Sequence, residues 1–237
     1  MRHINKTLFL RLLPFTFLAA IFLFGFITPK PTNQKVFVPP VFAQDQDHEP
    51  SPTPVPIIVW DKNRKLTWDD FVGQVPATPP ANLVAESHVG VHSTWKTSDK
   101  CEDVGESGKK KCTATITEVS AQAEFDPNQS WVKPDSKTDS LLNHEQGHFD
   151  ISEIFARKKL EQMKKFVGQS ESAVADTDEK ATEDAEGKIE KKLMEICDAI
   201  DKEEDAMQKA YDTQTKHGTD ADQQKKWDEK IKKMLEK

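Results

Sequence analysis

The sequence is poor in cysteine, with 3 among 237 residues. None lies near the N-terminal apolar run, which argues against a lipid-modified N-terminus. Cys101 and Cys112 flank a Gly- and Lys-rich turn between two strand-like segments, where a hairpin disulfide suits an exported chain. Cys197 is left over in an apolar-lined helical segment, and this position predicts a buried thiol.

Acidic residues are absent from the first 43 positions, which contain five Lys or Arg. Basic residues precede the uncharged 18-residue run 12–29, so residues 1–28 are predicted to be a signal peptide or a signal anchor. Val41-Phe42-Ala43 offers a cleavage site, but it lies about 14 residues beyond the run. That spacing favours an uncleaved single-pass membrane anchor, with cleavage and secretion as the alternative. Either way, the remaining chain is expected outside the cytoplasm.

Eight of the 14 prolines fall in residues 29–56, which is typical of a stiff, extended linker. The following residues, 57–237, are enough for one domain with a sizeable core.

Beyond position 43 the chain has 28 basic and 40 acidic residues, a net charge of −12. Such an acidic chain is not expected to bind nucleic acid or to adhere to anionic lipid.

Acidic residues are concentrated in 168–210, with 14 Asp or Glu against six Lys. A solvated helical face explains this best, and no calcium-binding loop with alternating ligands and Gly is present. Apolar residues recur there at a spacing of three to four, which predicts a helix that delivers Tyr211 to the core. They are Ile189, Leu193, Ile196, Ile200, Met207 and Tyr211.

An HExxH motif stands at His144-Glu145-Gln146-Gly147-His148. The apolar spacing around it predicts a helix from near Thr138 to near Val167 that stops at Gly168. On a helix the two histidines share one face and reach one zinc ion at about 2.0–2.1 Å, while Glu145 can act as the general base. The alternative is an amphipathic helix that carries two histidines by chance. Asp150 is either simply solvated or orients an imidazole.

Catalytic zinc usually has three protein ligands and a water. His88 and His92 lie on a predicted strand about 13 Å apart, too far to share an ion. His217 precedes Gly218, a predicted helix stop, so it is placed in a last helical turn and proposed as the third ligand, with a helix cap as the alternative. Asp212 could equally be a ligand or a residue that orients a ligand, and Glu204 is a weaker candidate for the third ligand. Tyr211 would stabilise the oxyanion if its hydroxyl faces the zinc.

Several separated segments resemble a bacterial domain family that has no assigned biological role and is described as predicted secreted zinc-dependent proteases. They are Leu66–Gly73, Phe125–Val132, Leu141–Ile151, and the positions Tyr211, Asp212, Thr215, His217, Gly218, Gln224 and Trp227. The resemblance implies zinc binding by His144 and His148 with Glu145 as the base, and it makes Tyr211–His217 the other wall of the site. The acidic stretch between the two halves is longer than the family usually carries.

The predicted strands, Ile57–Trp60, Leu83–Trp95 and Thr113–Phe125, precede the predicted helices, which end with one around Gln223–Leu235. This order indicates an α+β, zincin-like fold with helices on one side of a small antiparallel sheet. By analogy with zinc peptidases, an extended substrate would lie along a sheet edge. The sequence therefore predicts an exported zinc metallopeptidase that cleaves peptide or protein substrates. The alternatives are a zinc-stabilised envelope scaffold or binding protein without turnover, and an enzyme that cleaves only its own linker.

Overall fold

The computed structural model describes residues 3–8, 54–80 and 83–236. It divides the chain into two units, one of Met1–Leu10 with Val55–Lys237 and one of Arg11–Pro54, and every element below belongs to the first. The apolar run 12–29 and most of the Pro-rich segment lie outside the described residues. Among the helices that are described, none is long and apolar enough to cross a membrane.

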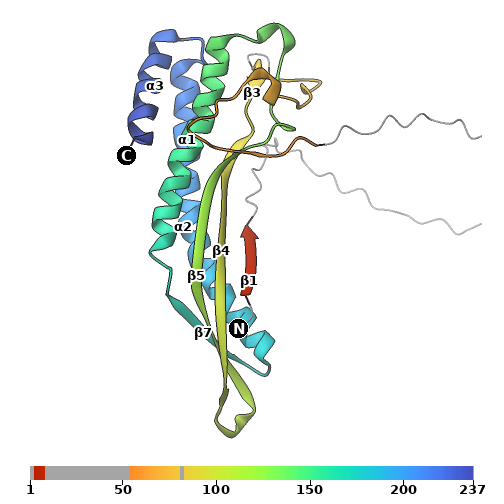
Figure 1. Ribbon diagram of the computed structural model, residues 1–237, viewed down its shortest axis with the longest axis vertical. Helices are drawn as coiled ribbons and strands as arrows, with labels where there is room; N and C mark the ends of the chain where they lie inside the picture. Colours follow the sequence, from red (N-terminus) through yellow and green to blue (C-terminus); the bar gives the residue numbers. More distant parts are fainter. Residues whose placement is uncertain (1–2, 9–53, 81–82, 237) are drawn as a thin grey trace, which may run out of the picture. The chain divides into compact units, whose positions relative to one another are not determined.

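The main sheet is antiparallel, in the order β1-β4-β5-β2, with β7 also paired to β5. Its centre is a long hairpin of β4 and β5, which Figure 1 shows running the length of the helices beside it. The bounds are β1 His3–Leu8, β2 Ile58–Val59, β4 Val89–Val104, β5 Lys109–Phe125 and β7 Ser170–Ala175. A second, two-stranded sheet pairs β3, Ala85–Glu86, with β6, Trp131–Val132.

The hairpin strands bury alternate residues, as expected for a sheet with one covered face. On β4 the buried positions are Ser93, Trp95 and Thr97, and on β5 they include Ala114 and Ile116. The antiparallel sheet and the helices packed on it confirm the predicted mixed α+β class, although β7 follows α1 in the chain, contrary to the predicted order of strands first and helices second.

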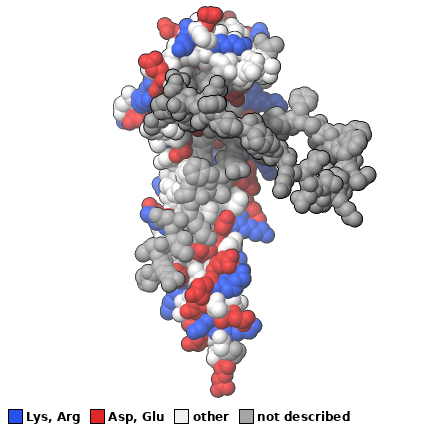
Figure 2. Space-filling model, turned by 90° about the vertical axis from the view of Figure 1, so that its right-hand side faces the viewer, with Lys and Arg blue, Asp and Glu red and all other residues white. Residues whose placement is uncertain are grey.

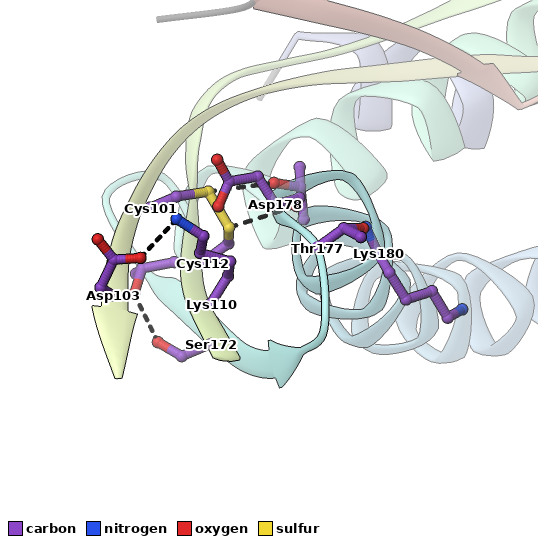
Figure 3. Close-up of a disulfide and its surroundings, with 10 residues drawn as sticks. Cys101, Asp103, Lys110, Cys112, Ser172, Thr177, Asp178 and Lys180 are labelled. Atoms are coloured by element: carbon purple, nitrogen blue, oxygen red, sulfur yellow. Dashed lines mark hydrogen bonds and ion pairs between the residues drawn. A yellow bond between two sulfur atoms is a disulfide. The ribbon is translucent and has the colours of Figure 1, made fainter. Parts of the chain in front are cut away.

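A disulfide joins Cys101 and Cys112, which stand directly opposite each other in the β4–β5 register. Figure 3 shows it beside the start of α2, where Cys112 Sγ contacts the backbone oxygen of Asp178 at 3.4 Å. The predicted hairpin disulfide is therefore confirmed. Cys197 is a free cysteine and is 2% exposed, which confirms the predicted buried thiol.

Three α-helices follow in the described chain: α1 Asp139–Lys164, α2 Asp178–Thr215 and α3 Ala221–Leu235. The two long helices, α1 and α2, lie side by side along the same side of the hairpin (Figure 1), and both contact β5. Thr138 caps α1 by accepting a hydrogen bond from Leu141 N at 3.2 Å, because its hydroxyl replaces the carbonyl partner missing in the first turn. The helix α1 ends at Lys164, three residues before the predicted end near Val167, and Gly168, with φ of 85°, lies in the turn that follows.

The acidic stretch is not helical throughout. Its first part, Ser170–Ala175, forms strand β7 at the edge of the sheet, with Thr113 and Ser172 hydroxyls 2.7 Å apart across the pair. The helical part exposes many of its acids beside lysines, as in the pair Lys180–Asp184 at 2.9 Å. Figure 2 shows acidic and basic side chains interspersed over the visible face.

Candidate metal centre

His144 and His148 lie one turn apart on the buried side of α1 and point their Nε2 atoms at each other. The two Nε2 atoms are 3.2 Å apart, and His144 is 1% exposed. The i, i+4 spacing on a helix produces this convergence.

The C-terminal turn of α2 adds Asp212 to this pair. Its Oδ1 atom lies 3.2 Å from His144 Nε2 and 3.0 Å from His148 Nε2. Burial opposes ionisation of this carboxyl, but the hydrogen bonds and charges of the two imidazoles outweigh it and hold the pKa of Asp212 far below its ordinary value. For His148, burial is likewise overcome by Asp212 and by the charge of Glu145, which raise its pKa to about 8.

His217 also reaches the cluster, but not from the predicted last helical turn. The helix α2 ends at Thr215, and Lys216, His217 and Gly218 all have left-handed backbones, with φ of 51°, 53° and 77°. This turn places His217 Nδ1 3.4 Å from Asp212 Oδ1, with the His217 side chain 38% exposed. A Cβ on Gly218 would stand 2.8 Å from His144 Cβ, so the close passage of the loop requires glycine.

The Nε2 atoms of His144 and His148 and the Oδ1 atom of Asp212 thus surround one point, and His217 Nδ1 approaches it beside Asp212 Oδ1. Zinc bonds of about 2.0–2.1 Å in a tetrahedron place neighbouring ligand atoms roughly 3.3 Å apart, and the four separations given above run from 3.0 to 3.4 Å. The ligand atoms of His144, Asp212 and His217 all lie within 4.8 Å of one another. Imidazole nitrogens with a carboxylate are a donor set that zinc prefers, so these residues fit the ion.

The outward nitrogens of the two α1 histidines meet glutamines. Gln208 of α2 places Oε1 2.7 Å from His148 Nδ1, and Gln224 of α3 places Oε1 3.1 Å from His144 Nδ1. Sequence reasoning missed Gln208 altogether and named Gln224 only through the family resemblance. Their spacing to the ligands, 60 and 80 residues along the chain, gives no local signal.

Glu145, between the two histidines, is 3% exposed. Its Oε2 atom accepts a short hydrogen bond from the hydroxyl of Ser87, which follows β3. Sequence reasoning did not single out Ser87, which holds the carboxylate that the motif assigns as the base.

Tyr211 does not offer its hydroxyl to the donor cluster. The hydroxyl donates to the backbone oxygen of His144 at 3.0 Å and accepts from Gln224 Nε2 at 2.7 Å, and the residue is fully buried. Burial raises the pKa of Tyr211 above its ordinary value. The predicted oxyanion role required a hydroxyl facing the metal, and the structure contradicts that condition.

Two further carboxylates lie away from the donors. Asp150 Oδ1 accepts from Trp60 Nε1 at 2.8 Å and from Gln146 Nε2 at 2.7 Å, so it does not orient an imidazole; two residues after His148, the helix has turned by about 200°. Glu204 accepts from Ser152 at 2.7 Å and lies eight residues before Asp212, about 12 Å along the helix. It is therefore no ligand.

The two strand-region histidines stay apart from the cluster. His88 precedes β4 and its backbone N donates to Ser130 Oγ, whereas His92 lies on β4 with Nδ1 3.7 Å from Glu124 Oε2.

A pocket of about 510 Å³ is lined, of the four donors, by His217 alone. His217, Gly218 and Gln224 form one wall, and the start of α1, including Thr138 and Asn143, forms another. The exposed side of His217 therefore faces a space large enough for a ligand side chain.

The fold and the site together define an α+β protein whose HExxH helix faces a carboxylate and a third histidine from its C-terminal half. The chain belongs to the family described as bacterial protein of unknown function (DUF922), which matches residues 67–218. This match spans more than half of the chain and includes all four donor residues. No curated protein and no solved structure matches the chain.

Proposed function

We propose that this protein is an exported zinc metallopeptidase whose centre is built from His144, His148, Asp212 and His217. The carrying observation is that both HExxH histidines and Asp212 Oδ1 converge within 3.0–3.2 Å of one another, with Glu145 between the histidines in the motif and with His217 lining a pocket.

His144, His148 and Asp212 would be the fixed ligands, because all three are carried by packed helices. His217, which the sequence proposes as the third ligand, would be a fourth donor at the open side. Its loop position and 38% exposure let it yield that place to water or to a substrate carbonyl. An open coordination position is what separates catalytic from structural zinc.

Zinc held there supplies a Lewis acid that polarises a carbonyl and lowers the pKa of water toward neutrality. Glu145 accepts the proton of the attacking water and passes it to the leaving amine. Ser87 holds one oxygen of Glu145, which fixes the carboxylate orientation.

The strand β3 ends at Glu86, directly before Ser87, and among the described residues it pairs with β6 alone, so its other edge is open. An extended peptide could add to its other edge and pass Glu145.

A second candidate function is a zinc-stabilised envelope protein without turnover. The observation that favours it is the number of protein donors, since four ligands in a tetrahedron close the site and are typical of structural zinc. The two functions differ in the role of Glu145, which is the general base in the peptidase and has no catalytic role in the structural protein.

The test is Glu145→Gln, assayed with a library of quenched fluorogenic peptides. Glutamine keeps an acceptor for Ser87 but cannot take a proton, so we expect equal zinc content and hydrolysis reduced by about 10²-fold or more. Glu153→Gln, on the same helix but paired with Arg157 at 2.8 Å, is the matched control and should behave as wild type. Hydrolysis unchanged in Glu145→Gln would remove the assigned base. A wild-type protein that binds zinc and cleaves no peptide would favour the second candidate.

A further inference from the structure

We infer that Gln208 and Gln224 are positioning residues that keep the proton of each HExxH imidazole on Nδ1 and so aim Nε2 at the metal. The inference rests on the metal centre proposed above, but not on peptide hydrolysis.

The orientation of the Gln208 amide follows from its other contacts. Its Nε2 donates to the backbone oxygen of His148 at 3.0 Å and to Ser152 Oγ at 3.3 Å. The Ser152 hydroxyl donates its own proton to Glu204, so only its lone pairs face the amide. A backbone carbonyl accepts and never donates, hence the NH₂ group must lie on this side and Oε1 must face His148.

The orientation of the Gln224 amide is fixed in the same way. Its Nε2 donates to Asp228 Oδ1 at 2.8 Å and to the Tyr211 hydroxyl at 2.7 Å. A carboxylate accepts only, and the Tyr211 proton is already given to the His144 carbonyl. Asp228 is held in turn by Asn143 Nδ2 at 3.1 Å. The oxygen of Gln224 therefore faces His144.

Each imidazole consequently meets an oxygen without a proton at its Nδ1. At 2.7 Å from Gln208 Oε1, an unprotonated His148 Nδ1 would set two lone pairs against each other, so Nδ1 must carry the proton. At His144, the Thr215 hydroxyl lies 3.5 Å from Nδ1 but donates to the Tyr211 carbonyl, which adds a second acceptor there. With Nδ1 protonated, Nε2 of each ring is left as the metal-binding nitrogen.

The helix α2 supplies two of the groups that contact His148. Gln208 and Asp212 stand four residues apart on α2 and therefore on one face. They hold the same ring from opposite sides, at His148 Nδ1 and at His148 Nε2. Partners that fix ring orientation in this way typically contribute 10–100-fold to metal affinity.

The experiment measures zinc affinity by chelator competition in Gln208→Met and Gln224→Met. Methionine keeps the length of the side chain but removes the oxygen, so each variant should bind zinc about 10–100-fold more weakly. Gln214→Met is the matched control, because Gln214 also accepts one hydrogen bond, from Trp227 Nε1 at 3.0 Å, but touches no imidazole. Gln208→Glu, which retains an acceptor oxygen, should recover part of the lost affinity.

A second readout is independent of the variants' stability. In the zinc-loaded full chain, proton–nitrogen NMR should show two imidazole Nδ1–H protons protected from solvent exchange, and Gln208→Met should expose that of His148 alone. Metal bound through Nδ1, unprotected Nδ1–H protons in the wild type, or equal affinity losses in Gln208→Met and Gln214→Met would overturn the inference. If these results hold and no peptide is cleaved, the inference stands and only the peptidase proposal fails.

Discussion

The ring of Tyr211 stacks on the imidazole of His144, with centroids 4.6 Å apart and planes at 19°, and its hydroxyl donates to the backbone oxygen of the same residue. One side chain of α2 thus covers both the ring and the peptide of the first metal ligand. Tyr211 also packs against Trp227 of α3, at 5.4 Å between centroids, so the stack ties the three helices together behind the centre.

Tyr211→Phe tests whether this residue supports the site or takes part in chemistry. The ring stays and two hydrogen bonds are lost, so we expect a lower free energy of unfolding, by about 1–3 kcal/mol. Hydrolysis by the zinc-loaded variant should fall by much less than the roughly 10²–10³-fold typical of a lost oxyanion donor. A fall of that size at unchanged zinc content would instead restore the oxyanion role.

Gly147→Ala should be strongly destabilising, although alanine usually favours a helix by about 1 kcal/mol. The added Cβ would stand 2.1 Å from the Tyr211 hydroxyl and 2.6 Å from its ring, so the α1–α2 contact has to separate. Gly187→Ala in α2 is the control, because nothing lies within 4 Å of its Cβ, and it should be stabilising. Denaturant unfolding of both variants measures the difference, and similar curves would mean that this contact is not tight.

Asp212→Ala should weaken zinc binding more than His217→Ala does. Asp212 Oδ1 is close to three imidazole nitrogens, whereas water can replace the exposed His217. We expect a loss above 10²-fold for Asp212→Ala, beyond the effect of an indirect partner, and no loss for His92→Ala. The opposite order in a chelator titration would make His217 the firm third ligand and Asp212 its neighbour.

Glu204 should make stability depend on pH in the metal-free protein. Burial raises its pKa from 4.5 to about 7, although Ser152 and Lys159 oppose the shift. The unfolded chain releases this proton near pH 4.5, but the folded chain retains it until about pH 7. The contribution to stability is therefore full below pH 4.5 and is lost as the pH rises through 7.

Glu204→Gln removes that dependence and keeps an acceptor for Ser152. At pH 8 the variant should be more stable than wild type, by up to about 3 kcal/mol, and the two should converge near pH 4.5. Chemical unfolding with a zinc chelator present measures both, and parallel pH profiles would show that Glu204 is not the responsible group.

Several elements of the fold could be predicted from local sequence patterns. The HExxH helix and the Cys101–Cys112 bridge follow from spacing and turn composition over a few residues, although the helix ends at Lys164 and not at the predicted Gly168 stop. Strand β7 was missed because its six residues, Ser-Glu-Ser-Ala-Val-Ala, show no alternation of polar and apolar side chains and lie inside an acidic segment. The position of His217 was wrong because Gly218 was taken as the stop, while the left-handed turn already begins at Lys216.

The rest of the site depends on contacts between distant segments. Asp212 could be proposed only as one of several alternatives, since its distance to the histidines is set by how α2 packs on α1. Gln208 carries no charge and belongs to no motif. Its role follows only from the 2.7 Å contact with His148 Nδ1, which no periodicity in the sequence reveals.

Zinc stoichiometry of the purified protein tests the metal centre most directly. Measured by elemental analysis after dialysis, the wild-type chain should retain one zinc ion, and His148→Ala should retain little, because it loses the nitrogen that lies 3.0 Å from Asp212 and 3.2 Å from His144. A wild-type chain without bound zinc, or a His148→Ala variant that holds zinc as firmly as wild type, would contradict the centre proposed here.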